Sequence, residues 1–278
     1  RAEADKEAPA SLEELQQRVA GVLEEHDVPA VGIAMVDRDG PVWVGSLGLA
    51  DRERRTAVSA ETLFRIGSIT KTFNALAFLM LSEDGVLDLD ASLRSLAPDA
   101  PLDNPWAPAN RVSIAQLLEH TAGLMDLTKD EFDHNTPFPD LSSALAYGAR
   151  HRKIRWPPGM HHSYSNAGAG LAAYALERVT SKKWETFMLE RVLRPLGMEC
   201  ATLVHDDATR ERLAKGYDSD GETEIPYWHM VFPALGAINA TSLQEGYVID
   251  LGGGSAQVVE IREGFPERCI SLPLGALR

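Results

Sequence analysis

Hydrophobic and polar positions in the first part of the chain predict a helix followed by a β-hairpin. Apolar residues recur at helical spacing over residues 12–23, and Ser11 stands in front of them as the expected N-cap. Two runs rich in β-branched residues, 28–36 and 42–49, lie on either side of Asp39-Gly40. Alternating apolar runs around an Asp-Gly pair are typical of a hairpin.

The rest of the pattern is mostly helical. Residues 68–83 are apolar nearly all round, so this helix is expected to be buried on every side. Residues 98–110 contain four prolines and are expected to form a loop. Helical spacing returns over 114–119, 166–180 and 184–193. The order predicts an α/β (α+β) domain with an inserted helical subdomain.

Charge and length narrow the classes of partner. The chain has 278 residues, enough for one large or two small domains, and a net charge of −14. No cluster of Lys or Arg interrupts the negative field, which excludes nucleic acid and anionic lipid as main partners. The longest apolar run, 75–81, is far shorter than the roughly 20 residues of a membrane helix. Residue 1 is Arg rather than Met, so the N-terminus is expected to be processed or cut.

Ser68-Ile69-Thr70-Lys71 carries the first candidate chemistry. Residues three apart share a helix face, so the amine of Lys71 is expected within hydrogen-bond reach of the Ser68 hydroxyl. A neutral amine there can take the hydroxyl proton, and burial favours the neutral form of a lysine. The alternative, an N-cap serine with a solvated lysine, is disfavoured because this lysine lies in the first turn of an apolar helix.

Tyr164-Ser165-Asn166 is the second candidate, between a Pro-Pro-Gly turn and a predicted helix. A phenol can relay a proton to a leaving group, and an Asn amide can hold the lysine and a substrate carbonyl. The next residues, 168–173, fit the dinucleotide pattern G-x-G-x-x-A. No apolar strand precedes them, so close helix packing is the preferred interpretation. The histidines near Tyr164 match no zinc spacing, and no metal site is predicted.

Five blocks, in family order over about residues 10–241, resemble the class C β-lactamase and D-alanyl-D-alanine carboxypeptidase family, which also includes esterases of that fold. The blocks are residues 63–71, 117–124, 157–159 with 163–168, 195–198, and 215–217. The resemblance implies a β-lactamase-like antiparallel sheet flanked by helices. It implies no cofactor, and it favours a periplasmic or secreted protein, with the cytoplasm left open. The oligomeric state is unknown.

Residue by residue, the same resemblance implies Ser68 as the nucleophile that forms an acyl intermediate. It implies Lys71 as its base, Tyr164 as co-base and later acid, and Asn166 as a positioning and substrate-binding group. His120 matches a block that is structural in the family, and no catalytic role is assigned to it.

The C-terminal part departs from this family. A third motif, Lys-Thr-Gly or His-x-Gly, is expected on a strand beside the nucleophile, and residues 165–278 do not carry it in a plausible place. The segment from residue 246 instead resembles the exopolyphosphatase and guanosine-pentaphosphate phosphatase family. There an Asp-x-Gly-Gly-Gly-Ser loop holds phosphate through its backbone N–H groups. The matching residues are Asp250, Gly252, Gly253, Gly254 and Ser255.

We therefore expect a chimera: a truncated hydrolase domain over residues 1–241, in which the C-terminal strands are missing or replaced, and a phosphatase-like fragment over 242–278. A piece below roughly 40 residues rarely folds alone. Its three strand-like segments, 247–251, 256–261 and 269–272, are expected to dock as a surrogate edge of the sheet near Ser68. The alternative is a tail that is loose or folded as a separate hairpin.

Three functions follow from these features. The first is an acyl-transfer hydrolase acting on a small ester, a D-amino peptide or a β-lactam. The second is a non-catalytic remnant, such as a binding or scaffold protein or a broken enzyme. The third is a phosphate-binding or phosphatase-like protein acting through the C-terminal loop.

Overall fold

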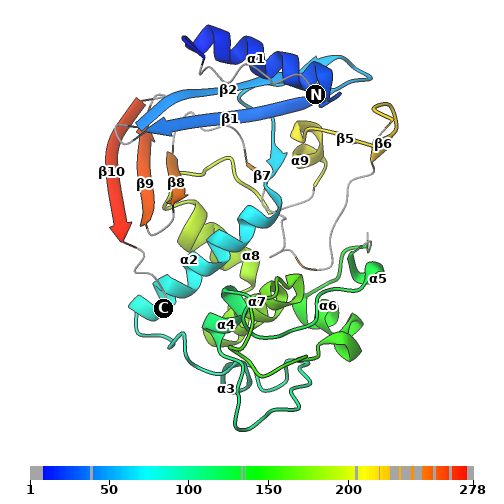
Figure 1. Ribbon diagram of the computed structural model, residues 1–278, viewed down its shortest axis with the longest axis vertical. Coiled ribbons are helices and arrows are strands. Elements are labelled where there is room, and N and C mark those ends of the chain that lie inside the picture. The colour runs from blue at the N-terminus through cyan, green and yellow to red at the C-terminus, as the bar shows by residue number, and fades with distance from the viewer. Residues whose placement is uncertain are drawn as a thin grey trace.

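The protein is known from a computed structural model that describes residues 9–37, 40–132, 134, 136–203, 206–218, 220–225, 232, 239–240, 246–252, 255–262 and 265–273. Figure 1 shows helix α1 on one side of a β-hairpin, a long helix α2 under the hairpin, and a group of helices at the opposite end of the molecule. Helices α1 and α2 thus flank the hairpin while other helices group away from it, in agreement with the predicted α/β (α+β) class.

The predicted N-terminal helix and hairpin are confirmed. Helix α1 spans Leu12–Glu25, and its N-cap Ser11 accepts the backbone N–H of Glu14. Strands β1 (Ala30–Asp37) and β2 (Gly40–Asp51) pair antiparallel, from Ala30 opposite Gly48 to Asp37 opposite Gly40. The short strand β3 (Thr56–Ala57) extends this sheet in the order β1-β2-β3.

The central and later helices follow, and α2, α4, α7 and α8 lie where the pattern predicts. The element bounds are β4 Phe64–Arg65, η1 Gly67–Ile69, α2 Thr70–Glu83, α3 Leu93–Leu96, α4 Ile114–Leu118, α5 Lys129–Phe132, α6 Leu141–Tyr147, η2 Ala149–His151, α7 Asn166–Thr180, α8 Trp184–Phe187, the π-helical η3 Met188–Leu193, and α9 Asp207–Arg212. Helices α3, α5, α6 and α9 were not predicted, because each is at most seven residues long and none has a full period of apolar positions. None of the described helices is long and apolar enough to cross a membrane.

Helix α7 lies at the centre of the hydrophobic core. Its residues Ala167 to Leu176 are all buried, and it contacts helices α2, α3, α4, α6 and α8. A Cβ atom on Gly168 would come within 3.3 Å of the Leu117 carbonyl oxygen, and one on Gly170 within 2.7 Å of the Phe232 ring. The G-x-G-x-x-A pattern therefore serves close helix packing, as preferred from the sequence.

Two expectations about buried and docked segments are wrong. Helix α2 is not buried on every side, because Ile69 just before it is 60% exposed and Leu79 within it is 44% exposed. The C-terminal segment does form three strands, β8 (Gly246–Gly252), β9 (Ser255–Arg262) and β10 (Phe265–Pro273). They pair with one another in the order β10-β9-β8, and among the described residues none of them pairs with β1, β2 or β3.

This separate three-stranded sheet approaches the hairpin at one end, where β9 and β10 contact β2 (Figure 1). Pairing between sequence neighbours closes short loops, which costs less entropy than pairing with a strand two hundred residues earlier. The local meander is therefore favoured over docking as an edge strand. The described strands also include two short pairs. Strand β4 pairs with β7 (Asn239–Ala240), and β5 (Gly216–Tyr217) pairs with β6 (Glu224–Ile225).

Candidate active site

Ser68 lies at the junction between an extended segment and a helix. Strand β4 ends at Arg65, the 3₁₀ turn η1 carries Ser68, and α2 begins at Thr70. Gly67 makes the turn with φ of 56°, a left-handed conformation that favours glycine. The exposed Ser68 side chain is thus presented at the start of a helix whose inner face packs into the core.

The structure brings the Lys71 and Tyr164 side chains together at Ser68. The Lys71 Nζ donates to the Ser68 Oγ at 2.9 Å, as expected for two residues three apart on a helix. The Tyr164 hydroxyl donates to the same Oγ, also at 2.9 Å. The Lys71 Nζ lies 5.1 Å from the centroid of the Tyr164 ring. The three groups therefore form one hydrogen-bonded cluster on a single oxygen atom.

Tyr164 owes its position to the segment that follows α4. The backbone N–H of Ser163 donates to the His120 carbonyl oxygen at 2.8 Å, and that of Ser165 donates to the His120 Nδ1 at 3.3 Å. The Ser165 hydroxyl donates to the Met125 carbonyl oxygen at 3.2 Å. The loop before α7 is thus held on both sides of the tyrosine, which fixes the direction of the phenol.

Asn166 is held by an acidic residue that sequence reasoning missed. Its backbone N–H donates to the Asp126 Oδ1 at 2.5 Å, and its side-chain Nδ2 donates to the Oδ2 at 3.1 Å. The only signal in the sequence was that Asp126 follows the block 117–124 by two positions. Asp126 therefore orients the first residue of α7 beside Tyr164.

His120 is neutral at neutral pH. Burial lowers the pKa of its imidazole from 6.5, the nearby His162 and Lys71 lower the pKa further, and Asp126 opposes them. Its ring packs on that of Tyr164 with centroids 4.2 Å apart, and the His162 ring meets it edge-on at 6.0 Å. A neutral imidazole can accept a hydrogen bond at Nδ1, as the contact with Ser165 requires.

Lys71 is less buried than predicted. It is half-buried, while Ser68 and Tyr164 are exposed. The hydrogen bond from Lys71 to Ser68, rather than deep burial of the lysine, therefore links the two residues.

The predicted phosphate loop falls at a strand junction. Asp250 and Gly252 belong to β8, Ser255 opens β9 opposite Gly252, and Gly253 and Gly254 lie outside the described residues. Phosphate binding there stays a prediction. Among the described residues, no group of three or more His, Cys, Asp or Glu side chains is placed to hold a metal ion.

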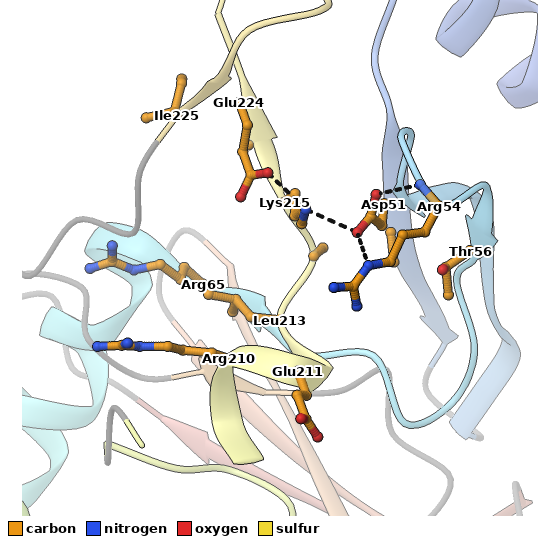
Figure 2. A pocket seen from close by; sticks show the side chains of 13 residues that line it. Asp51, Arg54, Thr56, Arg65, Arg210, Glu211, Leu213, Lys215, Glu224 and Ile225 are labelled. Atoms are coloured by element: carbon orange, nitrogen blue, oxygen red, sulfur yellow. Dashed lines mark hydrogen bonds and ion pairs between the residues drawn. The ribbon is translucent and has the colours of Figure 1, made fainter. Parts of the chain in front are cut away.

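Away from Ser68, a hollow of about 460 Å³ lies between β2, β4, α9 and the β5–β6 pair (Figure 2). At its wall the Lys215 Nζ contacts the Asp51 Oδ2 at 3.0 Å and the Glu224 Oε2 at 2.7 Å. The hydrogen bonds to Glu224 and Asp51 raise the pKa of Lys215, so it stays charged. The neighbouring Tyr217 hydroxyl accepts the Arg52 backbone N–H at 2.7 Å. Residues 215–217 thus tie β5 to the end of β2, and their contacts are structural.

Comparison with known proteins gives relatives of low identity and partial length. Protein flp of Staphylococcus aureus (strain MW2) is 27% identical over 219 residues, which are 76% of this chain and 43% of that protein. Penicillin-binding protein 4 of Amycolatopsis lactamdurans is 26% identical over 223 residues, covering 78% of this chain and 56% of that protein. The chain spans about half the length of these curated relatives.

The fold is shared with a solved structure, the octameric penicillin-binding protein homologue from Pyrococcus abyssi. It superposes with a TM-score of 0.72 at 24% identity and covers 84% of this chain and 54% of its own. This likeness confirms the β-lactamase-like fold that the sequence blocks predict.

A family model described as Beta-lactamase matches residues 15–259, from within α1 to within β9. The match includes the first part of the segment that resembles a phosphatase. That resemblance and the domain boundary after residue 241 stay predictions. Because the matched segment covers most of the sequence, this chain belongs to the beta-lactamase family.

Proposed function

We propose that this protein is a serine hydrolase that forms an acyl intermediate on Ser68 and acts on a small ester, a D-amino peptide or a β-lactam. The observation that carries the proposal is the convergence of Lys71 Nζ and Tyr164 OH on the Ser68 Oγ, each at 2.9 Å. A nucleophile within hydrogen-bond reach of a base, with a third group to orient it, is the arrangement that acyl transfer needs. Membership of the beta-lactamase family supports the same reaction class.

In the proposed acylation step the Ser68 oxygen attacks a carbonyl carbon while its proton passes to the amine of Lys71, which acts as base when it has given up its own extra proton. The tetrahedral intermediate collapses when the Tyr164 hydroxyl gives its proton to the leaving atom. The proton held on Lys71 then returns to the phenolate. A water molecule repeats the sequence on the acyl-serine and releases the acid, so every proton is accounted for.

The proposed oxyanion donor is the backbone N–H of Ser68, since amides at the start of a helix point outward and carry partial positive charge. Removing one oxyanion donor costs about 10²–10³ in turnover. We therefore expect turnover to depend strongly on this backbone N–H.

Intact-mass spectrometry after incubation with a fluorophosphonate, p-nitrophenyl acetate and a β-lactam tests the proposal. One adduct is expected on the wild type and none on Ser68→Ala or Lys71→Ala. Ser95→Ala, an exposed serine on α3, is the matched control and should label like the wild type. Labelling of Ser68→Ala would mean that the nucleophile lies elsewhere.

The absence of any adduct on the wild type would favour the second function, a non-catalytic binding or scaffold protein. The third, phosphate binding through residues 250–255, has its own test. Titration with inorganic phosphate should leave the chemical shifts of these backbone amides unchanged if the hydrolase proposal alone describes the protein.

A further inference from the structure

His120 contacts the backbone on both sides of Tyr164. It lies in the turn after α4 with φ of 62° and is half-buried. Its carbonyl oxygen accepts the N–H of Ser163, its Nδ1 accepts the N–H of Ser165, and its ring packs on the Tyr164 ring at 4.2 Å. One residue therefore fixes the backbone before and after the phenol and covers one face of the ring.

The contact at Nδ1 depends on protonation. A neutral imidazole has one nitrogen that accepts, whereas in the imidazolium both nitrogens are donors. On protonation, the Nδ1–H would face the Ser165 N–H, and two donors cannot form a hydrogen bond. The contact must then open, and Ser165 is the residue that joins Tyr164 to α7.

We propose that His120 is a proton-sensitive positioning residue: its neutral form holds the Tyr164 hydroxyl on the Ser68 Oγ, and its protonation releases the loop. The effect on acylation rests on the function proposed above. The contacts of His120 with Ser163, Ser165 and the Tyr164 ring, here called the clamp, belong to the fold and can be tested without catalysis.

The charges around His120 favour the neutral form. Lys71 faces it from α2, His162 from the Tyr164 loop, and Asp126 from the segment before α5; only Asp126 favours the protonated form. On its own segment, Glu119 accepts the Thr121 hydroxyl at 2.6 Å. Because the pKa of His120 is lowered in the closed loop, the clamp is fully stable above about pH 6.5. It weakens as the pH falls from there towards the lowered pKa.

Hydrogen exchange of the Ser163 and Ser165 amides, measured by NMR from pH 8 to pH 4.5, tests the clamp directly. We expect the Ser165 protection factor to fall by up to about tenfold per pH unit between pH 6.5 and the His120 pKa, then to level off. The Leu171 amide, within α7, is the internal control and should keep its protection. Constant protection of Ser165 across the His120 titration would overturn the proposal.

Two substitutions separate the acceptor from the charge. In His120→Asn the side-chain oxygen replaces Nδ1 as acceptor, does not titrate, and suits the left-handed backbone. In this variant the Ser165 amide should stay protected from exchange at every pH. Its rate of acylation by the fluorophosphonate should not show the fall at acid pH that we expect of the wild type. His120→Leu has no acceptor, and we expect roughly ten- to a hundredfold slower acylation at every pH, since misplaced groups cost this much. His26→Asn, an exposed histidine, is the control and should match the wild type.

The outcomes distinguish this inference from the proposed function. If the wild type forms no adduct but Ser165 loses protection in step with His120, the hydrolase proposal fails and the clamp stands. If acylation occurs and its rate falls at acid pH in His120→Asn as it does in the wild type, the clamp proposal fails and the hydrolase proposal stands. If His120→Leu does not fold, the wild-type pH series and the Asn variant still decide.

Discussion

Helices α1 and α7 have nearly the same length but opposite relations to the core. Among the 14 residues of α1 none is buried, and the helix packs on the outside of the hairpin, along β2 (Figure 1). Helix α7 has 15 residues, of which ten consecutive ones are buried. Asn166, Tyr164 and the His120 contacts all lie at the start of α7, so this side of the candidate site is supported by a buried helix.

We call the part of the molecule around α7 the helical half and the part around α1, β1 and β2 the hairpin half. The same chemical change should affect the stability of these two halves differently. Apolar area removed from water supplies most of the stability of a fold. A helix with no buried residue therefore contributes little, and changes there should leave the site intact.

The largest expected contrast concerns two ion pairs. Arg152 and Glu131 pair in the helical half with side chains 0% and 2% exposed, whereas Arg18 and Glu14 pair on α1 with side chains 38% and 37% exposed. Arg152→Met leaves the buried carboxylate of Glu131 without its partner and should lower the free energy of unfolding by about 3–5 kcal/mol. Arg18→Met should leave the urea midpoint unchanged.

The double variant Glu131→Met with Arg152→Met sharpens this test. Replacing a buried ion pair by apolar side chains is often close to neutral, so the double variant should be more stable than Arg152→Met alone. A single variant that unfolds at the wild-type urea concentration would show that the helical half is not the more sensitive one.

A matched Leu→Ala pair gives the next largest contrast. Leu171 on α7 is 0% exposed, and Leu15 on α1 is half-buried. Leu171→Ala should cost about 2–5 kcal/mol because it leaves a cavity in a close-packed core. Leu15→Ala should cost about 1 kcal/mol or less, since its site opens to solvent. Equal shifts of the denaturation midpoint would contradict the comparison.

The smallest expected effect is at Lys215, which links Asp51 at the end of β2 to Glu224 of β6. Lys215→Met should cost at most about 1 kcal/mol, because the Lys215 and Glu224 side chains are partly exposed and Asp51 keeps its hydrogen bond from the Arg54 N–H. The backbone N–H of Arg54 and the amine of Lys215 hold the pKa of Asp51 below 3.8. The contribution of Asp51 is therefore complete above about pH 4 and is lost as the pH falls through its lowered pKa.

Thermal unfolding between pH 7 and pH 3 measures this effect. The wild type should lose stability towards pH 3 in part through Asp51, and Lys215→Met should show a shallower loss over the same range. A wild-type slope that Lys215→Met leaves unaltered would assign the acid sensitivity to other carboxylates.

The sequence by itself determined those helices and strands whose hydrophobic pattern and end signals lie within one short segment of the chain. The bounds of α7, Asn166–Thr180, match the predicted range, and β1 and β2 pair antiparallel as the predicted hairpin requires. Lys71 reaches Ser68 because three residues along a helix bring side chains onto one face, whatever surrounds them.

Tertiary structure alone decided how distant segments meet. The Tyr164 hydroxyl reaches Ser68 because His120 and Met125 hold its loop. Asp126 accepts hydrogen bonds from Asn166, which lies 40 positions later in the sequence. The pairing of β8, β9 and β10 with one another, rather than with β1, likewise depended on which loops close at least cost. Such contacts carry no period in the sequence, because each depends on packing between residues that are neighbours only after the chain has folded.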